Sequence, residues 1–141
     1  MHHMQNVHAF VHRFHNPDAG ILLLRIALGI VFIYHGWMKF SAMEPTIGFF
    51  ASLGLAPIFT YITATAEVAG GLAFLAGIFA RYAGVVLTVM MAAAIWLVHI
   101  SNGFNVANGG YEFALVLMLG SAAIVTFGSG AYSLAAYLRK N

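Results

Sequence analysis

Six ionisable residues lie within or at the ends of long apolar stretches of this chain, and they are the residues most able to carry out chemistry. They comprise two histidines, two carboxylates, a lysine and an arginine: Arg25, His35, Lys39, Glu67, His99 and Glu112. Such a set can hydrogen-bond a polar headgroup and transfer protons, and histidine is the side chain that titrates near neutral pH. A purely structural network would need fewer charges, because each buried ionisable group carries a desolvation cost.

Metal chemistry is the main alternative for these residues. Facing Glu and His side chains build metal sites in helical bundles, but the Glu-x-x-His spacing of carboxylate di-metal bundles is missing here. We therefore predict no metal site, and a haem held by His35 and His99 stays a lesser alternative. For each histidine alone, an interhelical hydrogen bond is the structural alternative.

The composition places these residues in a membrane protein. Of the 141 residues, 62% are hydrophobic and 7% are charged, whereas soluble domains carry about 25% charged residues. The chain has no run of basic residues, which argues against nucleic acid as a partner and leaves the lipid bilayer. Cysteine is absent, which excludes disulfides, thiol relays and thiolate-bound iron–sulfur clusters within these residues.

The apolar stretches predict an all-α, polytopic four-helix transmembrane bundle over residues 19–138. The expected spans are 20–40, 58–80, 82–101 and 111–127. Residues 1–18 have the spacing of an interfacial amphipathic helix, and its histidines at i and i+4 offer a weaker metal-binding alternative. The connection 41–56 is too apolar for a free loop and too short to span, which indicates a re-entrant or interfacial segment.

Helical spacing sorts the ionisable residues of the first span. At about 100° per residue, Arg25, His35 and Lys39 project from one face, with Gly29 and Gly36 on or near it. This face should look into the bundle, because a charged group facing lipid is costly.

Depth along the spans predicts two groupings. Arg25 and Glu67 both lie well inside the bilayer and are expected to form a buried ion pair, which as an alternative only fixes helix register. A second group, near the membrane surface that carries the Asn- and Gly-rich loop 101–110, should consist of His35, Lys39, His99 and Glu112.

Several short motifs, in this order and spacing, resemble the DoxX family of small four-span bacterial membrane proteins. The resemblance covers roughly residues 19–135 and rests on Leu23-Leu24-Arg25-Ile26-Ala27-Leu28-Gly29, His35-Gly36-x-x-Lys39-Phe40, Phe49-Phe50 to Gly54 and Pro57, Glu67-x-x-Gly70-Gly71, Gly77-Ile78-Phe79-Ala80-Arg81, Tyr111-Glu112 and Gly128-x-Gly130-x-Tyr132-Ser133-Leu134. The family pattern usually closes with Asp where this chain has Ala135. The resemblance implies a membrane component of a redox system, some members being related to quinone oxidoreductase subunits.

Two kinds of function therefore stay open. As a quinone-linked oxidoreductase subunit, the chain would bind a quinone headgroup through Arg25, Lys39 and Glu67 and protonate it through His35, His99 and Glu112. A partner redox protein would supply the electrons, and the expected assembly is with this partner or as a homo-oligomer. The alternatives are a non-catalytic membrane scaffold that recruits a redox or detoxification partner, or a small-solute or proton pathway.

The basic residues predict the orientation in a bacterial inner membrane. With four spans, one side carries Arg13, Arg81, Arg139 and Lys140, and the other carries only Lys39 near a span end. The positive-inside rule then places both termini in the cytoplasm and the 101–110 loop outside.

Cysteine labelling tests this orientation without background, because the chain has no native cysteine. In intact cells, Asn105→Cys should react with a membrane-impermeant maleimide and Ser133→Cys should not, since they lie on opposite sides of the membrane. Labelling of Asn105→Cys only after permeabilisation would overturn the topology.

Overall fold

The computed structural model describes residues 15–141, and the amphipathic helix predicted for the N-terminal segment falls largely outside them. Throughout the described part the chain is helical, without strands, which confirms the predicted all-α class. The α-helices are α2 (Pro17–Ser41), α3 (Met43–Ser52), α4 (Pro57–Ala76), α5 (Ala80–Ala94), α6 (Glu112–Phe127) and α7 (Leu134–Leu138). Between α5 and α6 lie the short turns η1 (Ile95–His99), η2 (Ile100–Asn102) and η3 (Val106–Asn108).

Local sequence explains where the long helices begin and end. The side chain of Asn16 accepts a hydrogen bond from the backbone N–H of Ala19 at 3.0 Å, ahead of the proline that opens α2. Pro57 opens α4 in the same way. Helix α4 ends at Ala76 because Gly77 takes a left-handed conformation at φ +68°.

Within residues 15–141, three helical segments are long and apolar enough to cross a bilayer: Pro17–Ser41, Pro57–Ala76 and Ala80–Asn102. Helix α6 is also apolar but shorter, with 16 residues and a length of about 24 Å. The expected bounds 58–80 and 82–101, which put the turn between these spans at Arg81, are wrong. The turn is at 77–79, and Arg81 lies in the first turn of α5.

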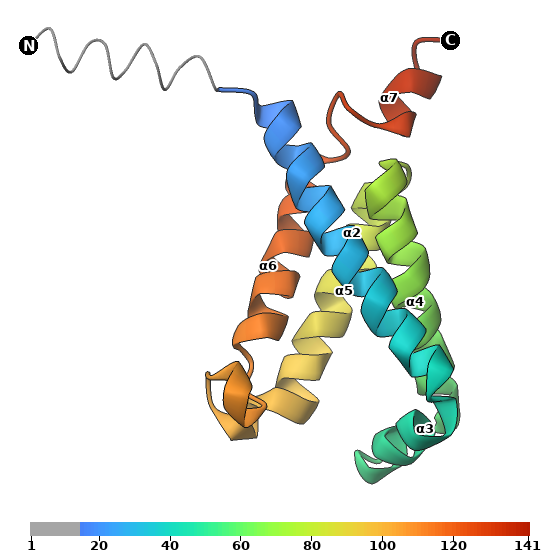
Figure 1. The fold of residues 1–141 in the computed structure, drawn as a ribbon, viewed down its shortest axis with the longest axis vertical. Helices are drawn as coiled ribbons and strands as arrows, with labels where there is room; N and C mark the ends of the chain where they lie inside the picture. Colours follow the sequence, from blue (N-terminus) through green and yellow to red (C-terminus); the bar gives the residue numbers. More distant parts are fainter. Residues whose placement is uncertain (1–14) are drawn as a thin grey trace, which may run out of the picture.

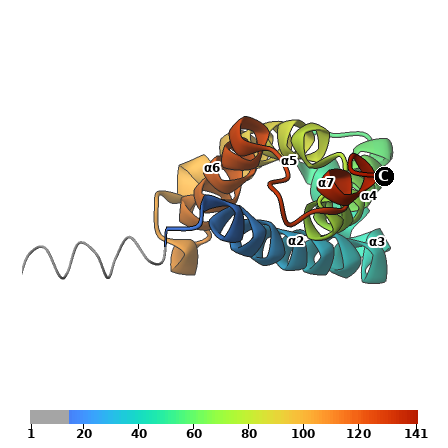
Figure 2. The same cartoon turned by 90° about the horizontal axis from the view of Figure 1, so that it is seen from above.

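The helices form two close pairs, α2 with α4 and α5 with α6. Figure 1 shows the described N-terminal end and the C-terminus at one end of the bundle, and α3 and the loop before α6 at the other. The two pairs lie close together near the termini and diverge toward the opposite end. Seen from the terminal end, the segment between α6 and α7 crosses over the ring of helices (Figure 2).

Glycines allow the backbones within each pair to approach closely. A Cβ atom on Gly71 of α4 would lie 2.7 Å from the carbonyl oxygen of Gly29 on α2, and one on Gly36 would lie 2.8 Å from the carbonyl of Ala64. In the other pair, a Cβ on Gly84 would lie 3.0 Å from the carbonyl of Ser121. Small residues in such seams are typical of packed membrane helices.

The apolar core lies where the two pairs meet. Its fully buried large side chains come from all four long helices and include Phe32, Phe74, Leu87 and Ile124. The rings of Phe32 and Phe74 meet edge to face with centroids 6.2 Å apart, a favoured aromatic geometry. Many other apolar side chains are exposed, as expected for helices that face lipid.

The α2–α4 seam predicts the effect of one added methyl group. Gly71→Ala should lower the free energy of unfolding in detergent by about 1–3 kcal/mol, because its Cβ would meet a backbone carbonyl that cannot move aside. Gly20→Ala is the matched control, since nothing lies within 4 Å of its Cβ. Equal melting temperatures for the two variants would contradict the close contact.

Candidate functional site

Arg25 lies at the terminal end of the bundle, where it binds backbone carbonyls. Its side chain donates from Nε to Phe74 O at 2.7 Å and from Nη2 to Leu75 O at 3.1 Å. Nη1 donates to Ser129 O at 2.6 Å and to Tyr132 O at 2.9 Å. The residue is 1% exposed, and two of its acceptors belong to the last turn of α4, whose carbonyls have no partner within the helix.

The predicted Arg25–Glu67 ion pair is therefore wrong. Phe74 lies seven residues beyond Glu67, about 10 Å further along α4. The exposed carbonyls of a helix end offer a guanidinium several acceptors in one place, which one distant carboxylate does not.

Glu67 pairs with Lys39 instead. Lys39 Nζ donates to Glu67 Oε2 at 2.5 Å, the single salt bridge among residues 15–141. Glu67 is 4% exposed and stands about 15 Å from the start of α4, close to the middle of the helix. The pair links α2 to α4, and removing Lys39 would leave the Glu67 carboxylate buried and unpaired, whereas the Lys39 side chain is 23% exposed.

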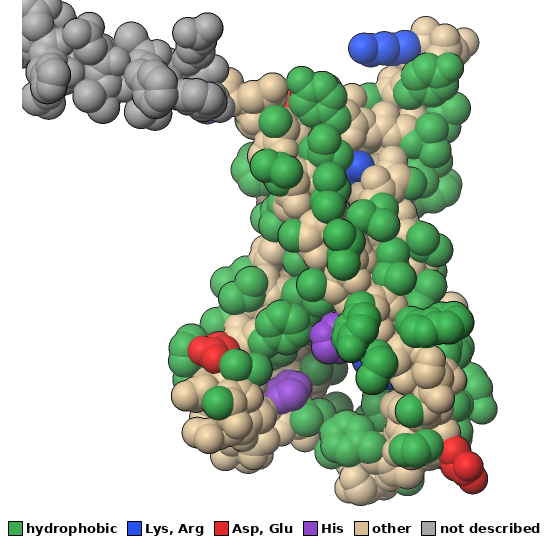
Figure 3. Space-filling model, viewed as in Figure 1, with side chains coloured by type: hydrophobic (Ala, Val, Ile, Leu, Met, Phe, Trp, Pro, Cys, Tyr) green, Lys and Arg blue, Asp and Glu red, His purple; other side chains and the backbone are tan. Residues whose placement is uncertain are grey.

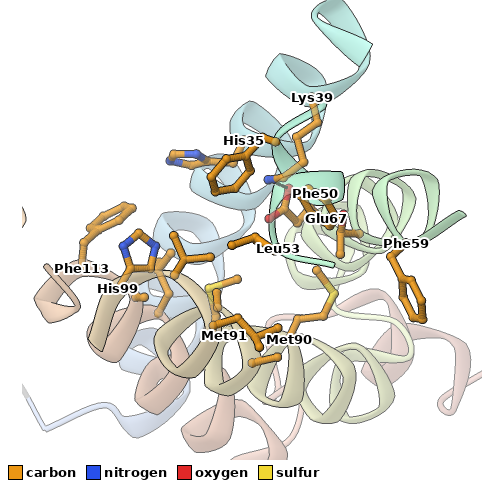
Figure 4. A pocket seen from close by; sticks show the side chains of 18 of the residues that line it. His35, Lys39, Phe50, Leu53, Phe59, Glu67, Met90, Met91, His99 and Phe113 are labelled. Carbon is orange, nitrogen blue, oxygen red and sulfur yellow. Dashed lines mark hydrogen bonds and ion pairs between the residues drawn. The ribbon is translucent and has the colours of Figure 1, made fainter. Parts of the chain in front are cut away.

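The ion pair forms part of the wall of a cavity of about 610 Å³ between the diverging helix pairs. Its charged or ionisable lining consists of His35, Lys39, Glu67 and His99, and most of the remaining lining is apolar. Figure 3 shows the surface hollowed at the end opposite the termini, with histidine side chains beside the hollow. Figure 4 shows the four residues around the space, from α2, α4 and η1.

His99 is held by the last turn of the α5 segment and by the following loop. It closes η1, a π-helical turn, and its Nδ1 lies 2.7 Å from the carbonyl oxygen of Gly109. A carbonyl oxygen only accepts, so Nδ1 must carry the proton in this contact. In the neutral ring, Nε2 is then left as an acceptor.

His35 is held by aromatic contacts. Its ring lies 5.7 Å from that of Tyr34, edge to face, and 5.8 Å from that of Phe113 on α6. Neither ring nitrogen hydrogen-bonds to another residue within 15–141. Both nitrogens are therefore available to a ligand.

Two of the six predicted site residues lie outside the cavity lining. Arg25 is at the other end of the bundle, as described above. Glu112 accepts a hydrogen bond from the backbone N–H of Val106 at 2.8 Å and so stabilises the loop before α6. As the first residue of α6 it follows the loop, and its carboxylate turns back toward it. The structure thus brings together His35, Lys39, Glu67 and His99, whose chemical roles stay predictions.

Comparison with known proteins identifies the family. The family model described as DoxX matches residues 20–100. The chain belongs to the DoxX family. It is 38% identical over 112 residues to "Putative oxidoreductase CatD" of Bacillus subtilis (strain 168), covering 79% of this chain and 81% of that protein. It is 27% identical over 123 residues to "Inner membrane protein YqjF" of Escherichia coli (strain K12), covering 87% of this chain and 95% of that protein. No solved structure matches the chain.

The matched range of this DoxX-family protein contains all four ionisable residues of the cavity, whereas Glu112 lies beyond it. Within residues 15–141, no group of three or more His, Asp or Glu side chains has a geometry that could hold a metal ion. The cavity is thus best described as an apolar chamber with one ion pair and two histidines.

Sequence reasoning missed most of the apolar wall. Phe50 and Leu53, at the end of α3, face Met90, Met91 and Phe113 across the space (Figure 4). The apolar content of 41–56 was the available signal, and the prediction of a short non-spanning segment there was correct. That this segment covers a cavity required the fold.

Double-mutant cycles test the Lys39–Glu67 ion pair. Lys39→Met should lower the free energy of unfolding by about 3–5 kcal/mol, because it leaves the buried Glu67 unpaired. Glu67→Gln should cost less, because Lys39 is 23% exposed, and the double variant should lose clearly less than the sum. Arg25→Met combined with Glu67→Gln should instead be additive within about 0.5 kcal/mol, because the two side chains share no partner. Thermal unfolding in detergent measures both cycles, and coupling between Arg25 and Glu67 would contradict the structure.

Proposed function

We propose that the cavity binds a quinone headgroup and that this DoxX-family protein is the membrane component of a quinone-linked oxidoreductase. The observation that carries the proposal is the Lys39–Glu67 ion pair in the wall of an apolar cavity that also contains two histidines. Its volume lies within the range of about 300–1,000 Å³ that is typical of small-molecule sites.

The donors and acceptors of the cavity fit the two forms of a quinone. Lys39 Nζ has three N–H donors, and Glu67 takes one of them. The others can reach a quinone carbonyl, which only accepts hydrogen bonds. On reduction the ligand gains O–H groups, and the acceptor nitrogen of His99 suits that form. The surrounding Phe50, Leu53 and Phe113 provide apolar contact for the flat ring.

The reaction balances when a partner redox protein supplies the electrons. A quinone takes up two electrons and two protons to give a quinol, so the site must deliver two protons as the electrons arrive. His35 and His99 are suited to this, because a ring nitrogen of imidazole can carry a proton and release it to a hydrogen-bonded ligand. Lys39 orients one carbonyl and lends positive charge to the oxygen that becomes negative during reduction.

The relatives support the general class. One is named "Putative oxidoreductase CatD", and another is named an inner membrane protein. We therefore propose that this chain lies in a bacterial inner membrane. The distribution of Arg and Lys favours cytoplasmic termini, and the cavity would then open toward the outer face.

Ligand binding by purified protein tests the proposal. A short-chain ubiquinone analogue should raise the melting temperature in detergent, and His99→Ala should weaken its binding about tenfold, the effect of one lost hydrogen bond of roughly 1.4 kcal/mol. His15→Ala, an exposed histidine at the start of the described chain, is the matched control and should bind as the native protein does. A native protein with no quinone-dependent shift, purified together with an associated enzyme, would support the scaffold alternative instead.

A further inference from the structure

We infer that the cavity continues into a lateral cleft between α4 and α5 that holds the hydrocarbon tail of the ligand, so that the substrate is a lipid-soluble quinone taken from the bilayer. This inference rests on the proposed function, because it concerns the tail of the same ligand. The headgroup would lie at the Lys39–Glu67 pair and the tail between the two helices.

Helices α4 and α5 touch near their connecting turn and separate beyond it. A Cβ atom on Gly70 would lie 2.7 Å from Leu87 Cδ1, so the two helices are in close contact there. Toward the other end, both helices line the cavity that contains the ion pair. Apart from the ionisable groups, the residues that line it include Phe59, Ile62 and Thr63 on α4 and Val89, Met90, Ala93, Ala94 and Leu97 on the α5 segment.

Exposure shows that the cavity is open on this side. Ile62 is 51% exposed and Val89 is 64% exposed, although both line the cavity. On the α2 and α6 side, Phe32, Ala114 and Leu117 line the deeper part of the cavity and are buried, and Phe113, nearer the loop before α6, is 41% exposed, less than Ile62 or Val89. The opening therefore lies along spans of the protein that face lipid, and a ligand can pass through it without crossing water.

The chemistry of the cleft suits a hydrocarbon chain. Apart from the ion pair at its inner end, its walls are aliphatic, aromatic or small side chains. The hydroxyl of Thr63 donates to the carbonyl of Thr60 at 3.0 Å, so it needs no partner from a ligand. Ala93 and Ala94 leave space on the α5 wall. Phe59 is eight residues from Glu67, so the apolar wall of α4 extends about 12 Å from the ion pair.

Two ligands with the same headgroup separate the cleft from the headgroup site. We would measure binding of a benzoquinone without a tail and of its decyl derivative to protein in lipid nanodiscs. The decyl compound should bind more tightly by at least tenfold, because each methylene taken from water strengthens binding by about fourfold, although part of this gain is already provided by the bilayer.

Neighbouring alanines provide a matched pair of variants. Ala93→Trp should fill the cleft and weaken binding of the decyl compound at least tenfold, with less than a twofold effect on the tailless compound. Ala92→Trp is the control, because Ala92 is exposed and does not line the cavity. Ile62→Trp repeats the test from the opposite wall in case the first variant fails to fold.

The outcomes distinguish the two proposals. If both compounds bind the native protein equally and both cleft variants bind the decyl compound normally, the cleft is overturned and the headgroup site stands. If neither compound binds the native protein, the proposed function fails, and the cleft fails with it. Loss of decyl binding in Ala92→Trp as well would also overturn the cleft.

Discussion

The hydrogen bonds from Arg25 to backbone carbonyls fix the closed end of the bundle. In a bilayer, carbonyl groups at a helix end cannot turn to water and must find partners within the protein. Arg25 satisfies two carbonyls in the last turn of α4 and two in the segment after α6. One side chain of α2 therefore joins three parts of the chain, and burying its charge is acceptable because it donates four times. The backbone N–H of Ala131 adds to this join by donating to Asp18 at 2.7 Å.

Because one end is closed in this way, the other end can be open. The glycine seams hold α2 against α4 and α5 against α6, so the separation occurs between the pairs and not within them. The resulting cavity is lined by the Lys39–Glu67 ion pair, which belongs to α2 and α4, and by His99, which lies in the segment between α5 and α6. The spacing between its polar groups is therefore set by how far the pairs diverge. This spacing depends on the join at Arg25, although Arg25 does not line the cavity.

The sequence predicted the helical membrane class and the face of the first span, because both depend on local patterns of apolar residues and on helical periodicity. It also singled out His35, Lys39, Glu67 and His99, which line the cavity, because they are ionisable residues within or at the ends of apolar stretches. It failed for Arg25 because periodicity and depth give a residue's position but not its partner, and carbonyl acceptors have no signature in a sequence. It failed for Glu112 because the carboxylate turns back to a backbone N–H in the preceding loop, a contact set by the loop's conformation.

The position of His99 shows most clearly what the fold adds. Ala94 lines the cavity, and in a regular α-helix the residue five positions on would point about 140° away from it. In η1 the backbone N–H of Ile100 bonds to the carbonyl of Ile95, an i to i+5 bond. A turn closed in this way brings residues five apart closer to the same face, so that Ala94, Val98 and His99 all line the cavity. Such turns are rare and frequently occur at functional sites. The hydrogen bond from Nδ1 to Gly109 then fixes the ring. The backbone thus departs from α-helical geometry where this departure places a histidine at the cavity wall.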